Sequence, residues 1–147
     1  METFDIFLRG RRMKLIHNLM YQSVRRQYDL KQAEVELLLY SEANPGCTSH
    51  SAAEFLLLHK GQISQAVDHL KQLGYMKCER DPEDKRFIRM TITDQGREVL
   101  NVISEIADEI NRELFRDFSA EDFRKFKALS DQLIVNMDQL IRERKGK

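Results

Sequence analysis

The stretch from residue 48 to residue 92 constrains the fold most, because it predicts two short helices followed directly by a β-hairpin. Thr48 or Ser49 suits the N-cap of the first helix, which is interrupted near residues 59–61. The second helix carries one apolar stripe at helical spacing and is expected to stop at Gly74. The stripe consists of Ile63, Ala66, Val67, Leu70 and Leu73. The two helices are therefore expected to be joined by a tight turn.

Residues 75–80 and 87–92 are predicted to pair as two strands with a charged tip between them. In the second run, apolar Ile88, Met90 and Ile92 alternate with polar residues, which is the two-residue period of a half-buried strand. The connecting Asp81-Pro82-Glu83-Asp84 segment is rich in turn formers. The predicted order along the chain is helix, helix, helix, helix, strand, strand, helix, helix.

Long amphipathic helices flank this central stretch. One is predicted from about residue 4 to residue 27, and the next ends before the helix-breaking Asn44-Pro45-Gly46 segment. After the hairpin, Thr93 suits the cap of one long helix, and Ser119 with Asp122 opens another. Their apolar stripes exceed what a domain of about 60 residues can cover, so we predict a homodimer. An antiparallel helix pair within one chain is the alternative.

Charge and cysteine content limit the classes of function. The 24 basic and 24 acidic residues cancel, so any contact with nucleic acid must come from a local surface. Cys47 and Cys78 form no CxxC motif and the four histidines show no zinc-ligand spacing, which argues against a disulfide scaffold or a metal site. No segment is apolar enough for a signal peptide or a membrane span. We therefore expect a cytoplasmic protein with no cofactor and no membrane partner.

A helix fits the major groove of B-DNA and a thin hairpin reaches the neighbouring minor groove, so the central stretch suits duplex DNA. The hydroxyls of the first short helix are expected at phosphates, and these belong to Thr48, Ser49 and Ser51. The second helix is expected to read bases through Lys60, Gln62, Ser64 and Gln65, with His69 and Lys71 nearer the DNA backbone. The alternative is an ordinary solvated helix surface.

The hairpin carries three further candidates for DNA binding, which are Lys85, Arg86 and Arg89. A pairing of Asp84 with Arg86 would fix the guanidinium for insertion into a narrow minor groove, where negative potential is enhanced. The alternative is a solvated hairpin whose basic groups are neutralised by Asp81, Glu83 and Asp84.

Residues 63–100, ISQAVDHLKQLGYMKCERDPEDKRFIRMTITDQGREVL, resemble the multiple-antibiotic-resistance regulator (MarR) family of winged helix-turn-helix transcription regulators. The family features are a Ser or Thr in the reading helix, a D-x-L segment, a Gly that ends this helix, the wing pattern D-P-x-D-K/R-R and an L-T-x-x-G entry to the next helix. They fall on Ser64, Asp68, Leu70, Gly74, Asp81, Pro82, Asp84, Lys85, Arg86, Thr93 and Gly96. Helix order and length extend the resemblance over essentially the whole chain. Gln65 stands where the family often has Arg and Ile92 where it usually has Leu, so the operator need not be one of the best-known ones.

The resemblance implies a mainly α-helical fold with a small β-hairpin wing, forming one domain over residues 1–147. A winged helix-turn-helix at about 30–97 would be flanked by dimerisation helices at about 4–27 and 94–144. It further implies a bacterial repressor that binds double-stranded DNA as a homodimer and is released by a small aromatic or anionic effector. His17, Tyr21 and Tyr40 are candidates to line the effector pocket, although each residue type is more often a core or surface residue.

No enzyme is expected, because the GxGxxG, GxxxxGK[ST] and GxSxG motifs are absent. Two alternatives stay open. One is a winged helix that binds proteins instead of DNA. The other is a redox-sensing regulator acting through Cys47, which precedes a predicted helix N-terminus where a thiolate is favoured. Peroxide-sensing members of the resembled family usually carry their cysteine near the start of the first helix, which has none here, and Cys78 is expected at a buried strand position.

Overall fold

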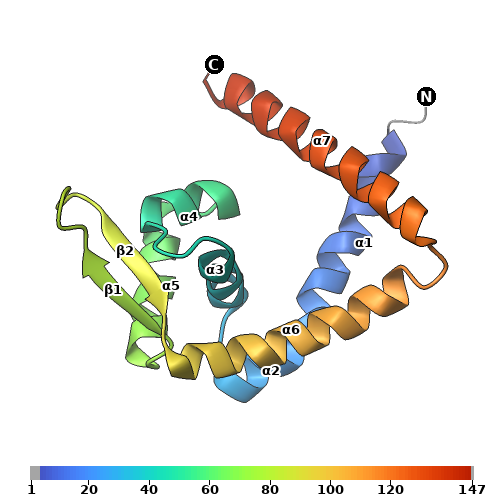
Figure 1. The fold of residues 1–147 in the computed structure, drawn as a ribbon. Helices are drawn as coiled ribbons and strands as arrows, with labels where there is room; N and C mark the ends of the chain where they lie inside the picture. The colour runs from blue at the N-terminus through green and yellow to red at the C-terminus, as the bar shows by residue number, and fades with distance from the viewer. Residues whose placement is uncertain (1–3, 147) are drawn as a thin grey trace. The chain divides into compact units, whose positions relative to one another are not determined.

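The computed structural model describes residues 4–146 and confirms a mainly helical fold with one small hairpin (Figure 1). The chain divides into two compact units, Met1–Asp108 and Glu109–Lys147, which we call unit 1 and unit 2. The elements are α1 (Phe4–Met20), α2 (Gln22–Tyr28), α3 (Gln32–Ala43), α4 (Ser49–Leu56), α5 (Lys60–Gln72), β1 (Met76–Arg80), β2 (Ile88–Ile92), α6 (Asp94–Leu114) and α7 (Ala120–Lys145). Unit 1 thus contains the helix-turn-helix and the hairpin.

The prediction of one helix over residues 4–27 is wrong, because the chain forms two helices, α1 and α2, that meet at Tyr21. Tyr21 has φ −100° and ψ 8°, which departs from helical geometry. Its side chain is buried, and its ring meets that of His17 edge to face with 5.4 Å between the centroids. Burial of this ring accompanies a break that the spacing of apolar residues does not reveal.

The caps predicted for the central helices are confirmed. The Thr48 Oγ1 accepts a hydrogen bond from the Ser51 N–H at 3.0 Å and starts α4. Leu57 ends α4 in the left-handed region with φ 56°, so the chain turns sharply before α5 begins at Lys60. Gly74 follows α5 with φ 79°, a conformation that favours glycine because it has no Cβ.

The predicted hairpin is confirmed, and its strand β2 also contacts the loop before α4, which sequence analysis missed. β1 and β2 pair antiparallel, with Met76 opposite Ile92. In addition, Thr48 forms a bridge with Arg89, and the Met90 N–H donates to the Cys47 carbonyl at 2.8 Å. The backbone of β2 is therefore joined to the loop that precedes α4.

The core of unit 1 lies where α3, α5, β2 and the start of α6 meet. Its largest fully buried side chains are Val24, Val35, Leu37, Leu38, Ile63, Leu70, Met90, Val99 and Ile103. Thr93 caps α6 as predicted, since its Oγ1 accepts from the Gly96 N–H at 3.1 Å. A Cβ at Gly96 would clash with the Tyr75 carbonyl, so the start of α6 requires glycine there. The hairpin and α6 are thereby held together closely.

Unit 2 contains the end of α6 and the whole of α7. Phe115 makes ring contacts with Phe118, Phe123 and Phe126 at centroid distances of 5.2, 5.0 and 5.4 Å. The predicted capping of α7 by Ser119 and Asp122 is confirmed. None of the side chains of α7 is buried. Across residues 4–146, no helix combines the length and the apolar character needed to cross a membrane.

Candidate nucleic-acid interface

α5 has one buried apolar face and one exposed polar face. Ile63, Ala66, Val67 and Leu70 are buried, which confirms the predicted stripe except for the half-buried Leu73. The residues predicted to read bases are all exposed, namely Lys60, Gln62, Ser64 and Gln65. Lys71 is exposed as well. A helix anchored in this way presents polar side chains outward on a rigid support.

Gln62 has a second role at the start of α5. Its Oε1 accepts a hydrogen bond from the His59 N–H at 2.9 Å, which caps the helix. The amide nitrogen of the same side chain is not needed for this bond. Gln62 is therefore partly committed to the helix end, whereas no such bond ties Ser64 or Gln65 among the described residues.

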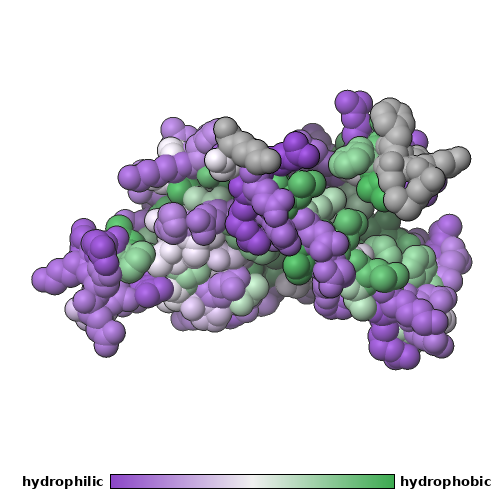
Figure 2. Space-filling view, turned by 90° about the horizontal axis from the view of Figure 1, so that it is seen from above, coloured by the Kyte–Doolittle hydropathy of each residue, from purple (hydrophilic) through white to green (hydrophobic). Residues whose placement is uncertain are grey.

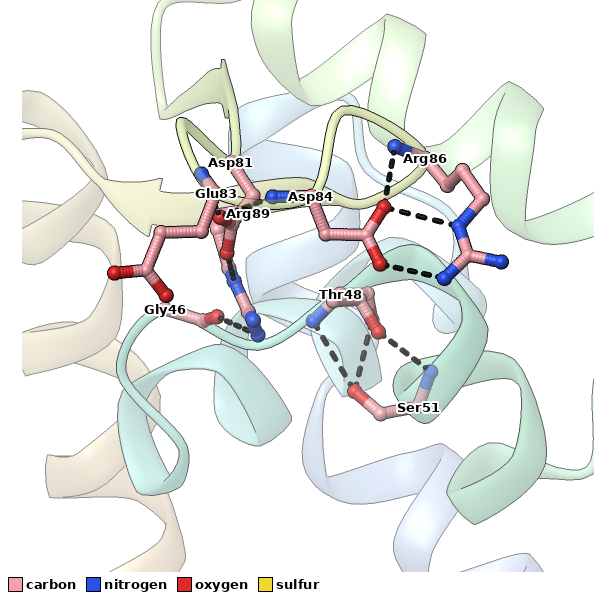
Figure 3. Close-up of polar contacts among 8 residues, drawn as sticks. All are labelled: Gly46, Thr48, Ser51, Asp81, Glu83, Asp84, Arg86 and Arg89. Atoms are coloured by element: carbon pink, nitrogen blue, oxygen red, sulfur yellow. Dashed lines mark hydrogen bonds and ion pairs between the residues drawn. The ribbon is translucent and has the colours of Figure 1, made fainter.

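The hydroxyls at the start of α4 serve its cap. The Thr48 N–H donates to Ser51 Oγ at 3.1 Å, and Ser51 Oγ donates to the Thr48 carbonyl at 3.0 Å (Figure 3). Thr48 is buried, while Ser49 and Ser51 are half-buried. The hydroxyls of Thr48 and Ser51, which were expected at phosphates, thus satisfy the helix N-terminus first.

His69 makes a contact that sequence analysis missed. Its Nδ1 lies 2.7 Å from Oε1 of Glu34, whose side chain is only 3% exposed. The other carboxylate oxygen of Glu34 accepts the Lys31 N–H at 2.8 Å and caps α3. His69 therefore joins α5 to α3. If His69 also contacts the DNA backbone as predicted, it must do so while its Nδ1 stays bonded to Glu34.

The predicted pairing of Asp84 with Arg86 at the hairpin tip is confirmed (Figure 3). Arg86 donates from Nη2 and Nε to the two carboxylate oxygens at 2.7 and 3.0 Å. The guanidinium lowers the pKa of the Asp84 carboxyl, assisted by the Arg86 backbone N–H, and the carboxylate in turn raises the pKa of Arg86. The Arg86 side chain is nevertheless 85% exposed, so it is oriented without being covered.

The other two basic residues of the hairpin differ from Arg86. Lys85 is exposed, and its carbonyl accepts a hydrogen bond from Arg80 Nη1 at 2.7 Å. Arg89 forms an ion pair with Asp81 at 2.9 Å, the neutralisation that the sequence left open as an alternative. The pKa of Asp81 is lowered, first by the Asp84 N–H and then by the Arg89 side chain. The three candidates therefore do not form one equivalent set.

The structure brings together two of the three residues predicted to line an effector pocket. His17 and Tyr21 are in ring contact, and burial raises the pKa of Tyr21, with Glu36 adding to the shift. Tyr40 instead packs on Phe55 of α4 at 5.0 Å between centroids. Two cavities of unit 1, of about 320 and 670 Å³, are lined by other residues. The one of about 670 Å³ lies along α5 and includes Gln65 and His69.

The Cys47 side chain is buried, contrary to what a thiol-based sensor requires. Its Sγ donates to Ser41 Oγ at 3.5 Å. Cys78 is half-buried rather than buried, and burial is the largest cause of its raised pKa. In the described part of the chain, no group of three or more His, Cys, Asp or Glu residues is placed to hold a metal ion.

A helix-turn-helix with an outward polar helix and a charged hairpin beside it defines a winged helix-turn-helix protein. A sequence model described as the MarR family matches residues 28–86. The regulator BilQ of Clostridioides difficile is 24% identical over 98 residues, which are 67% of this chain and 66% of that protein. Among solved structures, one described as MarR is 25% identical with a TM-score of 0.73, covering 95% of this chain and 91% of that one. Residues 28–86 of the chain are therefore similar to the MarR family, and the fold is that of the solved MarR structure.

A second solved structure is similar to this chain in fold. PcaV of Streptomyces coelicolor, described as a transcriptional regulator in complex with its natural ligand, is 21% identical with a TM-score of 0.66. The match covers 85% of this chain and 88% of PcaV. The BilQ match spans just under two thirds of that relative.

Proposed function

We propose that this chain is a transcription repressor that binds a pseudo-palindromic operator in duplex DNA as a homodimer. One observation carries the proposal: the exposed polar face of α5 and the exposed Arg86 of the wing belong to the same compact unit. A recognition helix in the major groove and a wing in the minor groove need such a pair. The similarity of residues 28–86 to the MarR family supports it.

The exposed apolar side chains at both ends of the chain support dimerisation. On α1, Met13 is 71% exposed, and on α7 Leu129 is 72% exposed. Further exposed apolar residues are Phe7, Leu15, Leu19, Phe123, Phe126, Leu133, Ile134, Val135 and Leu140. Apolar side chains reach the surface as green areas among the hydrophilic ones in Figure 2. Surfaces of this kind mark interaction sites, and a second copy of the chain is the proposed partner.

Release by a small aromatic or anionic effector is the finer part of the proposal. The ring contact between His17 and Tyr21 supports a shared role for these two residues. Tyr40 could belong to the same effector site only if that site reached from His17 and Tyr21 to the place where Tyr40 packs on Phe55. Salicylate, as an aromatic anion, is a suitable probe, and it should lower operator affinity in the wild type and less in a His17→Ala variant.

Selection of bound duplexes from a random pool tests the central proposal. The expected result is an enriched pseudo-palindrome with half-sites roughly 10 base pairs between centres. Fluorescence anisotropy on the enriched site should show affinity falling with salt, with a log-log slope near ~0.9 per phosphate contacted. Failure to enrich any sequence, with binding insensitive to salt, would favour a protein-interaction module.

A further inference from the structure

Arg89 connects the wing to the helix-turn-helix, although it lies on the hairpin. Its Nε donates to Asp81 Oδ2 at 2.9 Å, and its Nη1 donates to the carbonyl of Gly46 at 3.3 Å. Gly46 belongs to the loop between α3 and α4 (Figure 3). The guanidinium also lies 5.8 Å from the ring centroid of Phe87. Three different segments thus meet at one side chain.

Asp81 uses its two carboxylate oxygens for different tasks. Oδ1 accepts the Glu83 and Asp84 N–H groups at 2.8 and 3.0 Å and so shapes the turn of the wing. Oδ2 accepts from Arg89. The Asp81 side chain is 16% exposed, which is much less than that of Asp84 at 33%. One carboxylate therefore links the turn that carries Arg86 to the guanidinium that reaches Gly46.

The backbone reinforces this link at the same place. Thr48 bridges Arg89, and the neighbouring Met90 N–H donates to the Cys47 carbonyl. Arg86 has no comparable anchor to the loop before α4 among the described residues. Its hydrogen bonds all go to Asp84 within the same turn, and its guanidinium lies 5.9 Å from the ring centroid of the adjacent Phe87. The direction of Arg86 relative to α4 and α5 consequently depends on how the turn is tied to the rest of unit 1.

We propose that Asp81, Arg89 and the Gly46 carbonyl form a clip, here called the wing clip, that positions Arg86 for DNA, and that Arg89 is not itself a DNA contact. The proposal rests on the DNA-binding function proposed above. Arg89 is thereby moved from the set of direct contacts to that of positioning residues. The ion pair and the bond to Gly46 commit the Arg89 Nε–H and one Nη1–H to acceptors within the protein.

The Asp81→Asn variant separates the two roles by the sign of its effect. Asparagine keeps an Oδ1 acceptor for the turn, but its amide group cannot accept the Arg89 Nε–H. If Arg89 positions the wing, operator affinity should fall, by about tenfold if one good contact is lost. If Arg89 contacts DNA, the variant frees a cation and removes an anion, so affinity should rise. Unchanged or tighter binding overturns the proposal.

Glu83→Gln is the matched control for charge. It removes an acidic group from the same turn, where Glu83 contributes its backbone N–H to the bond with Asp81. Affinity should stay the same or rise slightly, because a repulsive charge is lost while the clip stays intact. If Glu83→Gln lost as much operator affinity as Asp81→Asn, both losses would be explained by charge alone and the clip would be overturned.

Two variants of Arg89 test the clip independently, in case Asp81→Asn does not fold. Arg89→Lys keeps the charge but lacks the planar guanidinium whose separate nitrogens donate to Asp81 and Gly46, so the clip predicts weaker binding, whereas a phosphate contact predicts near wild-type binding. Arg89→Gln should cost little further affinity on an Arg86→Ala background, because it acts through Arg86. Near wild-type binding by Arg89→Lys, or additive losses in the double variant, contradicts the clip.

A DNA-free measurement keeps the two proposals distinguishable. In nitrogen-15 NMR spectra of the full chain, the Arg89 Nε–H should exchange slowly with water in the wild type and rapidly in Asp81→Asn. If the wild type binds no duplex but shows this protection, the proposed function fails and the clip stands as a structural link. Rapid exchange in the wild type refutes the clip whatever the DNA result.

Discussion

Replacing Arg86 by alanine should weaken operator binding and leave the fold intact. The side chain is 85% exposed, hydrogen-bonds only to Asp84 among the described residues and lies over the ring of the exposed Phe87, so unit 1 loses no buried contact. The thermal midpoint should therefore move by no more than about 2 °C. Affinity should fall about 5- to 150-fold, which is the range for one good specific contact. The Asp84 carboxylate, left without its partner, adds repulsion toward phosphate and favours the upper end.

Anisotropy titration of the selected operator, alongside thermal unfolding, measures both quantities. Arg116→Ala is the control, because Arg116 of unit 2 is also exposed, at 70%, and is paired with Glu113 and Asp117. That variant should leave affinity unchanged. Unchanged affinity of Arg86→Ala would show that this side chain does not contact DNA and would confine the wing to a structural role. A large drop in thermal midpoint would show that Arg86 holds more of the fold than its contacts indicate.

Two further predictions concern assembly and pH. The chain should have a solution mass near twice 17.4 kDa. Deletion of residues 119–147 should cause aggregation, because it exposes the apolar side chains of α6. A monomeric mass of the full chain by light scattering, or a well-behaved monomer of the truncated chain, would count against the dimer. The pKa values of Asp81 and Asp84 are lowered by hydrogen bonds from the folded wing, so their stabilising contribution is present above the ordinary carboxyl value of 3.8 and is lost as pH falls through the lowered values. NMR titration of the two carboxyl carbons should accordingly give midpoints below 3.8, and midpoints at or above that value would contradict the hydrogen bonds of the wing.

Features of the site set by neighbours in sequence were predictable. Arg86 and Asp84 are two positions apart, and the pairing followed from the sequence of the turn. The caps at Thr48 and Ser119 depend on a partner three positions on, which the sequence displays directly. The hairpin and the buried stripe of α5 follow from periods of two and 3.6 residues. These are the parts that sequence analysis placed correctly.

The contacts that sequence analysis missed join residues far apart in the chain. Glu34 and His69 are 35 positions apart, and Arg89 and Gly46 are 43 apart. Residue type alone assigned both His69 and Arg89 to DNA, because a cation near a polar helix or hairpin suits phosphate as well as a carboxylate. Only the packing of α5 on α3, and of β2 on the loop before α4, shows which partner lies within reach. The break at Tyr21 was missed for a similar reason, since it accompanies burial of the ring in the core.

The measurement that tests the account most directly compares specific and random duplexes in one competition assay with Gln65→Ala. Gln65 is exposed on α5 between the buried Ile63 and Ala66, so its loss should leave the helix in place. Lys71→Ala, at a proposed contact to the DNA backbone, is the control and should weaken all duplexes alike. Gln65→Ala should lower affinity for the selected operator and relax preference at one position in each half-site, while random duplexes bind as before. Equal weakening of specific and random duplexes by Gln65→Ala would show that this residue of α5 does not read bases.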